Sequence, residues 1–128
     1  MKHNNCYIYP KSQREIINDK RHYNINKEKL PSVTTIISAT QSPEKTASLD
    51  AWRQRVGVKE AALITKEASD RGTAMHKILE EYIIGQGYLD LTPTGLDAHN
   101  MAIRVISQGL CNVSEYYGLA ATLHYPGL

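Results

Sequence analysis

The chain has 128 residues, of which 41% are hydrophobic and 22% charged, so it can form one modest globular domain at most. Its net charge of +2 neither indicates nor excludes nucleic-acid binding. It contains no apolar run of membrane-spanning length and no apolar signal segment, so we expect a cytoplasmic protein without a membrane partner. Two isolated cysteines, Cys6 and Cys111, form neither a zinc motif nor a disulfide framework, as is typical of a reducing compartment.

Residues 1–31 predict a β-hairpin. Weakly alternating apolar residues lie on both sides of a turn-like sequence at residues 18–20. Residues 26–29 predict a second turn. Ser32 then caps a short helix over residues 33–37, although the β-branched residues there fit a strand almost as well.

The clearest helix start is Ser-Pro-Glu at residues 42–44. It combines a hydroxyl cap, a proline at the first helical position and a carboxylate in the first turn. This helix should end near Arg55, and Gly57 should separate it from a second helical pattern over residues 58–68. The residues of that second pattern expected to face inward are Ala61, Ile64 and Ala68.

Residues 69–85 continue as an amphipathic helix. The residues of its core-facing stripe are Met75, Ile78, Leu79, Tyr82 and Ile83. His76 lies just outside this stripe, and Glu80 follows on the same flank one turn later. Gly85 supplies the left-handed residue that commonly ends a helix. Gly72 costs about 1 kcal/mol in a helix relative to alanine, which suggests a close approach of backbone or ligand there.

The rest of the chain predicts one more helix and two strands. Residues 92–93, Thr-Pro, start the helix. Its apolar stripe consists of Leu96, His99, Ile103, Ile106 and Leu110. We interpret His99 as a packed, hydrogen-bonded side chain without a catalytic role. Residues 115–117 and 119–125 predict two strands with a turn at Gly118, and because two strands do not form a stable sheet, further strands are expected.

His76 and Glu80 are the candidate metal ligands. Side chains four apart on a helix have Cβ atoms about 5–6 Å from each other, so both can reach one ion. Lys77 follows His76, which excludes the His-Glu-x-x-His zinc signature. Two ligands do not hold a catalytic divalent ion, and the alternative is a boundary histidine with a solvated carboxylate.

Two further sets of residues are candidates for DNA binding. One is a basic edge with a tryptophan available for stacking on a base: Trp52, Arg53, Arg55, Lys59 and Arg71. The alternative is a tryptophan in the core and solvated arginines. The other set can contact phosphate oxygens at a helix N-terminus, unless it only caps the helix: Ser32, Thr34 and Thr35. No Gly-rich phosphate loop, Gly-x-Ser-x-Gly elbow or Cys/His pair is present.

Three sequence blocks occur in a fixed order. They are Leu-Pro-Ser-Val-Thr-Thr-Ile-Ile at residues 30–37, Trp-Arg-x-Arg-Val-Gly at residues 52–57, and Arg-Gly-Thr-Ala-Met-His-Lys-Ile-Leu-Glu at residues 71–80. Together they resemble the N-terminal half of RecB-like PD-(D/E)XK exonucleases, in particular phage-encoded exonucleases related to the mitochondrial genome maintenance exonuclease. The resemblance covers residues 20–125, and its Arg-Gly-x-x-x-His block is the most specific part.

The resemblance implies roles for individual residues. In that family a helical histidine matching His76 helps to bind the catalytic Mg²⁺ or Mn²⁺, and Glu80 would support this site. Glu115 would lie on the first strand of the nuclease sheet. The implied partner is DNA, as linear ends or single strands, in repair or recombination. A phage-encoded member would act in the host cytoplasm.

The chain also departs from the family. Family members continue into a Gly-x-x-Asp strand and an Asp/Glu-x-Lys strand, whose acids hold the metal and whose lysine activates water or stabilises charge. Neither motif occurs in residues 112–128, where the family continues: residues 118–121 carry alanine where an acid would stand, and residues 127–128 resemble the approach to the first acidic strand. The sequence therefore reads as a truncated gene product. Because metal-assisted hydrolysis needs several converging ligands, we expect the chain alone to be inactive unless a separate chain supplies the missing strands.

The expected fold is α/β for the whole enzyme and α+β for this chain, as the mainly helical part of a restriction-endonuclease-like PD-(D/E)XK fold. One partial domain would hold a hairpin and short helix in residues 1–40, a helical part in residues 42–110, and the start of the nuclease sheet in residues 112–128. The expected function is that of an N-terminal fragment of a metal-dependent DNA exonuclease. The alternatives are a non-catalytic nucleic-acid-binding or protein-interaction module and a partly folded remnant.

Overall fold

The computed structural model describes residues 1–126. These residues form a mixture of helices and small sheets, which is compatible with the expected α+β class. By internal contacts the chain divides into two units. One unit holds residues 1–5 and 53–119, and the other holds residues 6–52 and the described residues from Ala120 onward. Within residues 1–126, no helix has both the length and the apolar character to cross a membrane.

An antiparallel sheet of three strands forms the N-terminal part of the second unit. Its order is β2 (Ser12–Ile17), β3 (Lys20–Ile25) and β4 (Glu28–Pro31). The two turns hold left-handed residues, with φ of 52° and 60° in residues 18–19 and of 52° and 67° in residues 26–27. Asparagine and aspartate favour such two-residue turns because they tolerate positive φ. The predicted hairpin is therefore confirmed, whereas the predicted turn at 26–29 is shorter and leads into a third strand.

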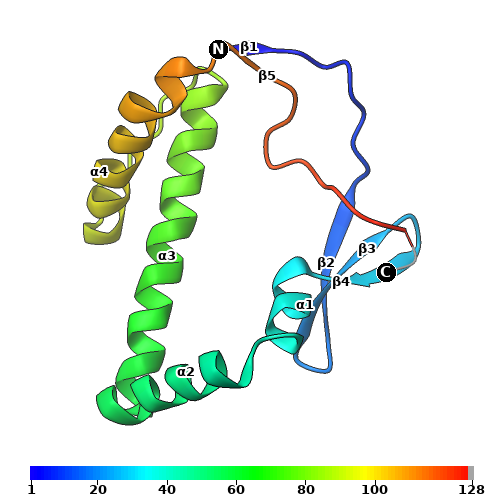
Figure 1. The fold of residues 1–128 in the computed structure, drawn as a ribbon. Helices are drawn as coiled ribbons and strands as arrows, with labels where there is room; N and C mark the ends of the chain where they lie inside the picture. The colour runs from blue at the N-terminus through cyan, green and yellow to red at the C-terminus, as the bar shows by residue number, and fades with distance from the viewer. Residues whose placement is uncertain (127–128) are drawn as a thin grey trace. The chain divides into compact units, whose positions relative to one another are not determined.

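The short helix α1 (Val33–Ala39) lies beside this sheet (Figure 1). The hydroxyl of Ser32 accepts a hydrogen bond from the Thr35 backbone N–H at 3.1 Å, so the predicted cap is confirmed and the strand alternative is wrong. The Ser32 N–H and the Thr35 hydroxyl both donate to the carbonyl of Arg21, at 3.1 and 3.0 Å. These bonds fix the start of α1 against β3.

Two longer helices follow, α2 (Pro43–Val56) and α3 (Val58–Ile83). Gly57 separates them with a φ of 91°, a left-handed conformation that glycine adopts without strain, so the predicted break is confirmed. The patterns over residues 58–68 and 69–83 merge into the single helix α3, and Gly85 follows its end with a φ of 81°. Ala61 is buried as expected. Ile64 and Ala68 are exposed, so their predicted inward orientation is wrong.

Helix α4 (Pro93–Gln108) packs on α3, and both run in the same direction in Figure 1. Thr92 caps it by accepting from the Gly95 N–H at 3.0 Å, which confirms the predicted start. The core of this pair is Ile78 of α3 against Ala98 and Ala102 of α4. Small side chains at this contact let the two helices approach closely.

The predicted stripes of the two helices are each confirmed only in part. On α3, Ile78 is buried and Tyr82 is 49% exposed. In the stripe predicted for α4, His99, Ile106 and Leu110 are half-buried, but Leu96 and Ile103 are 50% and 60% exposed, so their predicted inward orientation is wrong. The residues of α4 that are buried are Gly95, Ala98 and Ala102. The short side chains make the contact, and the larger aliphatic ones lie outside it.

After α4 the chain forms a short 3₁₀ helix, η1 (Leu110–Asn112), and a two-residue strand, β5 (Glu115–Tyr116). Strand β5 pairs in parallel with β1 (Lys2–His3) at the N-terminus of the chain. The strand predicted at residues 115–117 is confirmed for two residues. The second strand, predicted at residues 119–125, is wrong, since these residues form no ladder. Residues 127–128, expected to lead into an acidic strand, lie outside the described residues.

Candidate metal and nucleic-acid-binding residues

His76 and Glu80 lie one turn apart on α3, in the unit that also holds α4. The His76 side chain is exposed and Glu80 is half-buried. Neither side chain makes a hydrogen bond or an ion pair with any other residue between positions 1 and 126. An imidazole and a carboxylate on one helix flank can therefore both turn towards a ligand from outside this unit.

Next to this pair, Lys77 forms an ion pair with Glu81 on the same helix. The hydrogen bond and the charge of Glu81 raise the pKa of Lys77, and Glu80 contributes less to this shift. The Lys77 ammonium also lies 5.7 Å from the ring centroid of Tyr88. Since Lys77 is held mainly by Glu81, it leaves the carboxylate of Glu80 outside an ion pair.

This flank of α3 does not complete a divalent-metal site. Mg²⁺ takes six ligands, chiefly oxygens, in a nearly octahedral arrangement. His76 and Glu80 provide two, and within the described part of the chain no three His, Cys, Asp or Glu side chains are grouped to hold an ion. The residues present fit only part of a Mg²⁺ or Mn²⁺ site, so no chemical step can be assigned to them alone.

The arginines expected to form a basic edge are only partly brought together. Arg53 lines a hollow of about 510 Å³ with residues of α3, among them Thr65 and Ser69. Lys66 and Asp70 form an ion pair at 2.7 Å in the same wall, and the hydrogen bond and charge of Asp70 raise the pKa of Lys66. The other predicted members do not line this hollow: Arg55, Lys59 and Arg71.

Trp52 and the hydroxyl residues belong to the other unit. Trp52 is half-buried near the end of α2. Ser32 is only 6% exposed, and its hydroxyl lies 3.0 Å from the Thr34 hydroxyl and 2.8 Å from the Thr35 hydroxyl, in addition to accepting the Thr35 N–H. For Ser32 the capping alternative is therefore the better interpretation, because its oxygen is surrounded by partners within the chain.

Thr34 and Thr35 line a different hollow, of about 360 Å³, whose opposite wall holds Lys20 and Arg21. These two cations are not among the binding residues predicted from the sequence, and neither is Ser38, which lies in the same hollow. The signal that was available is a pair of adjacent cations directly after a tight turn. Only the pairing of the turn with α1 brings them opposite the threonines.

Two other candidate residues have structural roles. His99 is half-buried, and its Nε2 accepts a hydrogen bond from the Asp90 N–H at 3.0 Å, which confirms that it is packed and hydrogen-bonded. The carboxylate of Asp90 accepts from the Thr92 hydroxyl at 2.7 Å and from its N–H at 3.0 Å, and these bonds lower the pKa of Asp90. Glu115 accepts from the Asn4 amide at 2.7 Å, which helps to join β5 to β1.

Comparisons with protein-family models, with curated protein sequences and with solved structures find nothing that matches this chain. The resemblance to RecB-like exonucleases therefore depends on the three sequence blocks alone. Function is accordingly a proposal.

Proposed function

We propose that this chain is the helical N-terminal part of a RecB-like PD-(D/E)XK exonuclease that hydrolyses phosphodiester bonds from DNA ends with Mg²⁺ or Mn²⁺. The observation that carries the proposal is the position of the Arg-Gly-x-x-x-His block. It falls within the uninterrupted helix α3, and it presents the side chains of His76 and Glu80 one turn apart, without hydrogen-bond or ion-pair partners for those side chains among residues 1–126. In the proposed restriction-endonuclease-like fold, helices pack on a mixed sheet.

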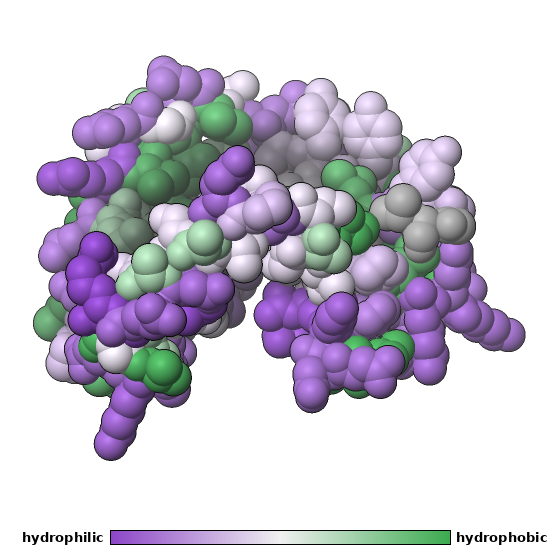
Figure 2. Space-filling view, turned by 60° about the horizontal axis from the view of Figure 1, so that its bottom comes forward, coloured by the Kyte–Doolittle hydropathy of each residue, from purple (hydrophilic) through white to green (hydrophobic). Residues whose placement is uncertain are grey.

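The distribution of apolar side chains supports a missing sheet. On α4, Leu96 and Ile103 are 50% and 60% exposed, and on α3 Val58 is 77% exposed. Figure 2 shows hydrophobic side chains reaching the surface among hydrophilic ones. Exposed apolar faces of this kind mark contact surfaces in soluble proteins. A nuclease sheet supplied by further chain or by a partner would cover such faces.

Within this proposal the residues of the chain bind and orient, and they do not complete the reaction. A bound Mg²⁺ or Mn²⁺ would polarise the phosphate and lower the pKa of a water molecule. His76 would contribute one nitrogen ligand, and Glu80 would contribute or orient an oxygen. The chain has no Asp/Glu-x-Lys sequence and no Gly-x-x-Asp sequence after α4, so we expect the isolated chain to be inactive.

A Mn²⁺ titration followed by NMR tests the proposed metal role directly. Paramagnetic Mn²⁺ should broaden the amide signals around His76 and Glu80, and the broadening should disappear in His76→Ala and after addition of a chelator. His22→Ala is the control, because His22 belongs to the three-stranded sheet. Absence of broadening around residue 76, or broadening unchanged in His76→Ala, would argue against the proposed metal role. In parallel, Mg²⁺-dependent digestion of linear DNA by the pure chain would contradict the expected inactivity.

A second candidate is a non-catalytic nucleic-acid-binding module. It is favoured by the two cations and the hydroxyls that line the hollow beside α1. Such a module would bind DNA without cleaving it, and its affinity would fall steeply with salt. If the chain does not bind DNA even at low salt, this candidate is excluded.

A further inference from the structure

The hollow beside α1 is built from two chain segments that backbone hydrogen bonds hold in place. One wall is the turn between β2 and β3, and the other is one face of α1. The residues that line it are Asp19, Lys20, Arg21, Thr34, Thr35, Ser38 and Ala39. The carbonyl of Arg21 accepts hydrogen bonds from the Ser32 N–H and the Thr35 hydroxyl, which join the two walls. The hollow is therefore part of the fold of one unit and is not a gap between the two units of the chain.

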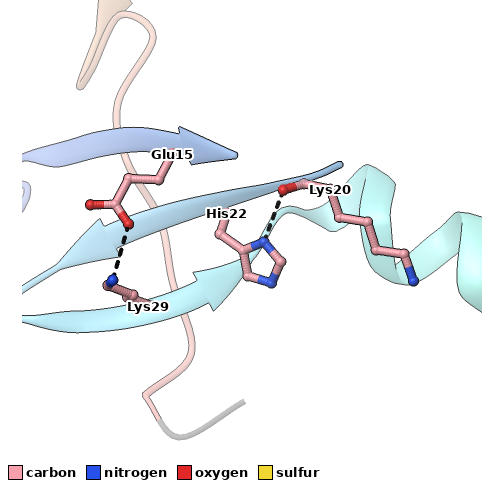
Figure 3. Close-up of polar contacts among 4 residues, drawn as sticks. All are labelled: Glu15, Lys20, His22 and Lys29. Carbon is pink, nitrogen blue, oxygen red and sulfur yellow. Dashed lines mark hydrogen bonds and ion pairs between the residues drawn. The ribbon is translucent and has the colours of Figure 1, made fainter. Parts of the chain in front are cut away.

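The cations of this hollow have no ion-pair partner among the described residues. Lys20 and Arg21 are exposed, and neither makes an ion pair with any of residues 1–126. The nearby carboxylate of Glu15 is engaged elsewhere, 3.7 Å from the ammonium of Lys29. Figure 3 shows the Lys20 side chain extending away from this pair, while its backbone carbonyl lies 3.1 Å from Nδ1 of His22. With Asp19 as the one carboxylate in its lining, the hollow has a net positive charge.

The hydroxyls on α1 differ in what they can donate. The Thr35 hydroxyl gives its hydrogen to the Arg21 carbonyl, so in the 2.8 Å contact between Ser32 and Thr35 the hydrogen belongs to Ser32. Thr34 then donates to Ser32 across 3.0 Å, but it can rotate towards a ligand, because Ser32 keeps its bond from the Thr35 N–H. Ser38 lies one turn after Thr34 and makes no side-chain hydrogen bond within residues 1–126. Ser38 is thus a ready donor, and Thr34 a second one after rotation.

We propose that this hollow binds a phosphate group of the DNA strand through the cations of Lys20 and Arg21 and the hydroxyl of Ser38. Two cations and hydroxyl donors are the groups that proteins use for phosphate oxygens. None of the described residues that line the hollow is aromatic, so they offer no surface on which a base can stack. The contact therefore holds the backbone of the strand independently of sequence. It rests on the proposed function only in taking DNA as the ligand.

Fluorescence anisotropy of a labelled single-stranded oligonucleotide, measured at several salt concentrations, tests this site. Lys20→Ala and Arg21→Ala should each weaken binding several-fold at low salt. Each should also reduce the slope of log K against log salt by about 0.7, the value for one phosphate contact on a single strand. Lys45→Ala is the matched control, because it removes one exposed cation from α2 in the same unit, outside the hollow.

A variant that is expected to strengthen DNA binding excludes loss of folding as the explanation for weaker binding in the other two variants. Asp19 has a φ of 60°, which asparagine also tolerates, so Asp19→Asn should keep the turn. Since it removes the carboxylate from the hollow, it should tighten DNA binding several-fold, whereas a misfolded variant would bind more weakly.

The outcomes separate this inference from the proposed function. Binding of DNA that does not respond to the three substitutions overturns the phosphate site and leaves the proposed function standing. Absence of DNA binding at low salt overturns both. Inorganic phosphate, titrated by NMR, should shift the amide signals of Lys20, Arg21 and Ser38, and the oligonucleotide should shift the same signals. A response to inorganic phosphate alone would assign the hollow to a free anion and overturn its assignment to DNA.

Discussion

The backbone N–H of Asp90 donates a hydrogen bond to Nε2 of His99 across 3.0 Å, and this bond joins the segment before α4 to the helix itself. The lone pair of Nε2 accepts this bond, which leaves Nδ1 as the ring nitrogen that can donate. Asp90 is itself tied to Thr92 through two hydrogen bonds. The start of α4 is thus fixed by one histidine and one carboxylate.

Replacing His99 by alanine removes the acceptor for the half-buried Asp90 N–H. We expect the free energy of unfolding to fall by about 1–3 kcal/mol, the usual cost of a buried donor left without a partner. Urea denaturation followed by circular dichroism measures this loss. Asn100→Ala, at the next and exposed position of α4, is the control and should change stability by less than about 0.5 kcal/mol. Equal losses in both variants would mean that the bond does not stabilise α4.

The lowered pKa of Asp90 predicts a dependence of stability on pH. Its pKa in the folded chain lies below the ordinary value of 3.8 because Thr92 donates two hydrogen bonds to the carboxylate. The ionised group therefore stabilises the fold above pH 3.8, and this contribution is lost as the pH falls below that value towards the folded pKa. Urea denaturation at pH 6 and pH 3 should show wild type more stable than Asp90→Asn at the higher pH and the difference shrinking at the lower one.

Asp97→Asn provides the comparison for this measurement. Asp97 is exposed on α4, and its side chain makes no hydrogen bond with the rest of residues 1–126. Its substitution should leave the pH dependence of stability close to that of wild type. If the Asp90 and Asp97 variants behave alike, the two bonds from Thr92 do not account for the pH effect.

The elements with local signals could be predicted from the sequence. The Ser32 cap, the break at Gly57 and the Thr92 cap each depend on residues within one turn of chain, and the structure has all three. The spacing of His76 and Glu80 on one flank is equally local, because it follows from the helix period. The sequence could not show whether a third metal ligand lies near them, since that depends on other elements.

The predictions that failed depend on contacts between distant parts of the chain. Apolar periodicity placed Leu96 and Ile103 inside, but the partner surface on α3 presents the large Ile78, against which alanines pack closely. Strand β5 finds its partner in β1 at the N-terminus, which no pattern in residues 112–125 indicates. The hollow beside α1 likewise arises only when the β2–β3 turn meets the helix.

Gly95 and Gly72 predict opposite effects of alanine. A Cβ at Gly95 would lie 2.2 Å from Cγ of Asp90 and 2.5 Å from its carbonyl oxygen, so Gly95→Ala must displace the backbone. We expect a destabilisation of about 1–3 kcal/mol, as for overpacked sites. A Cβ at Gly72 would meet no atom within 4 Å, so no close backbone approach from the described residues explains this glycine. Gly72→Ala should stabilise α3 by up to about 1 kcal/mol.

Thermal unfolding of both variants measures these effects on stability. Measuring Mn²⁺ and DNA binding by Gly72→Ala also tests whether this glycine has a role in binding a ligand. If Gly72 serves the approach of a ligand, Gly72→Ala should weaken Mn²⁺ or DNA binding while raising the melting temperature. A destabilised Gly72→Ala variant would instead indicate a packing role that the described contacts do not contain. Similar stability changes at the two glycines would contradict the clash at Gly95.

The exposed apolar face of α4 predicts self-association. Ile103 is 60% exposed, and an exposed apolar side chain promotes contact between copies of the chain at high concentration. Ile103→Gln should therefore reduce concentration-dependent association in sedimentation velocity, with little effect on the free energy of unfolding. Ala102→Gln is the contrasting change, because Ala102 is 1% exposed and a longer polar side chain there should destabilise the α3–α4 pair by about 1–3 kcal/mol. If Ile103→Gln is the more destabilising of the two, the α4 face that contains Ile103 belongs to the core of this chain. The proposal that further nuclease elements cover this face would then lose its support.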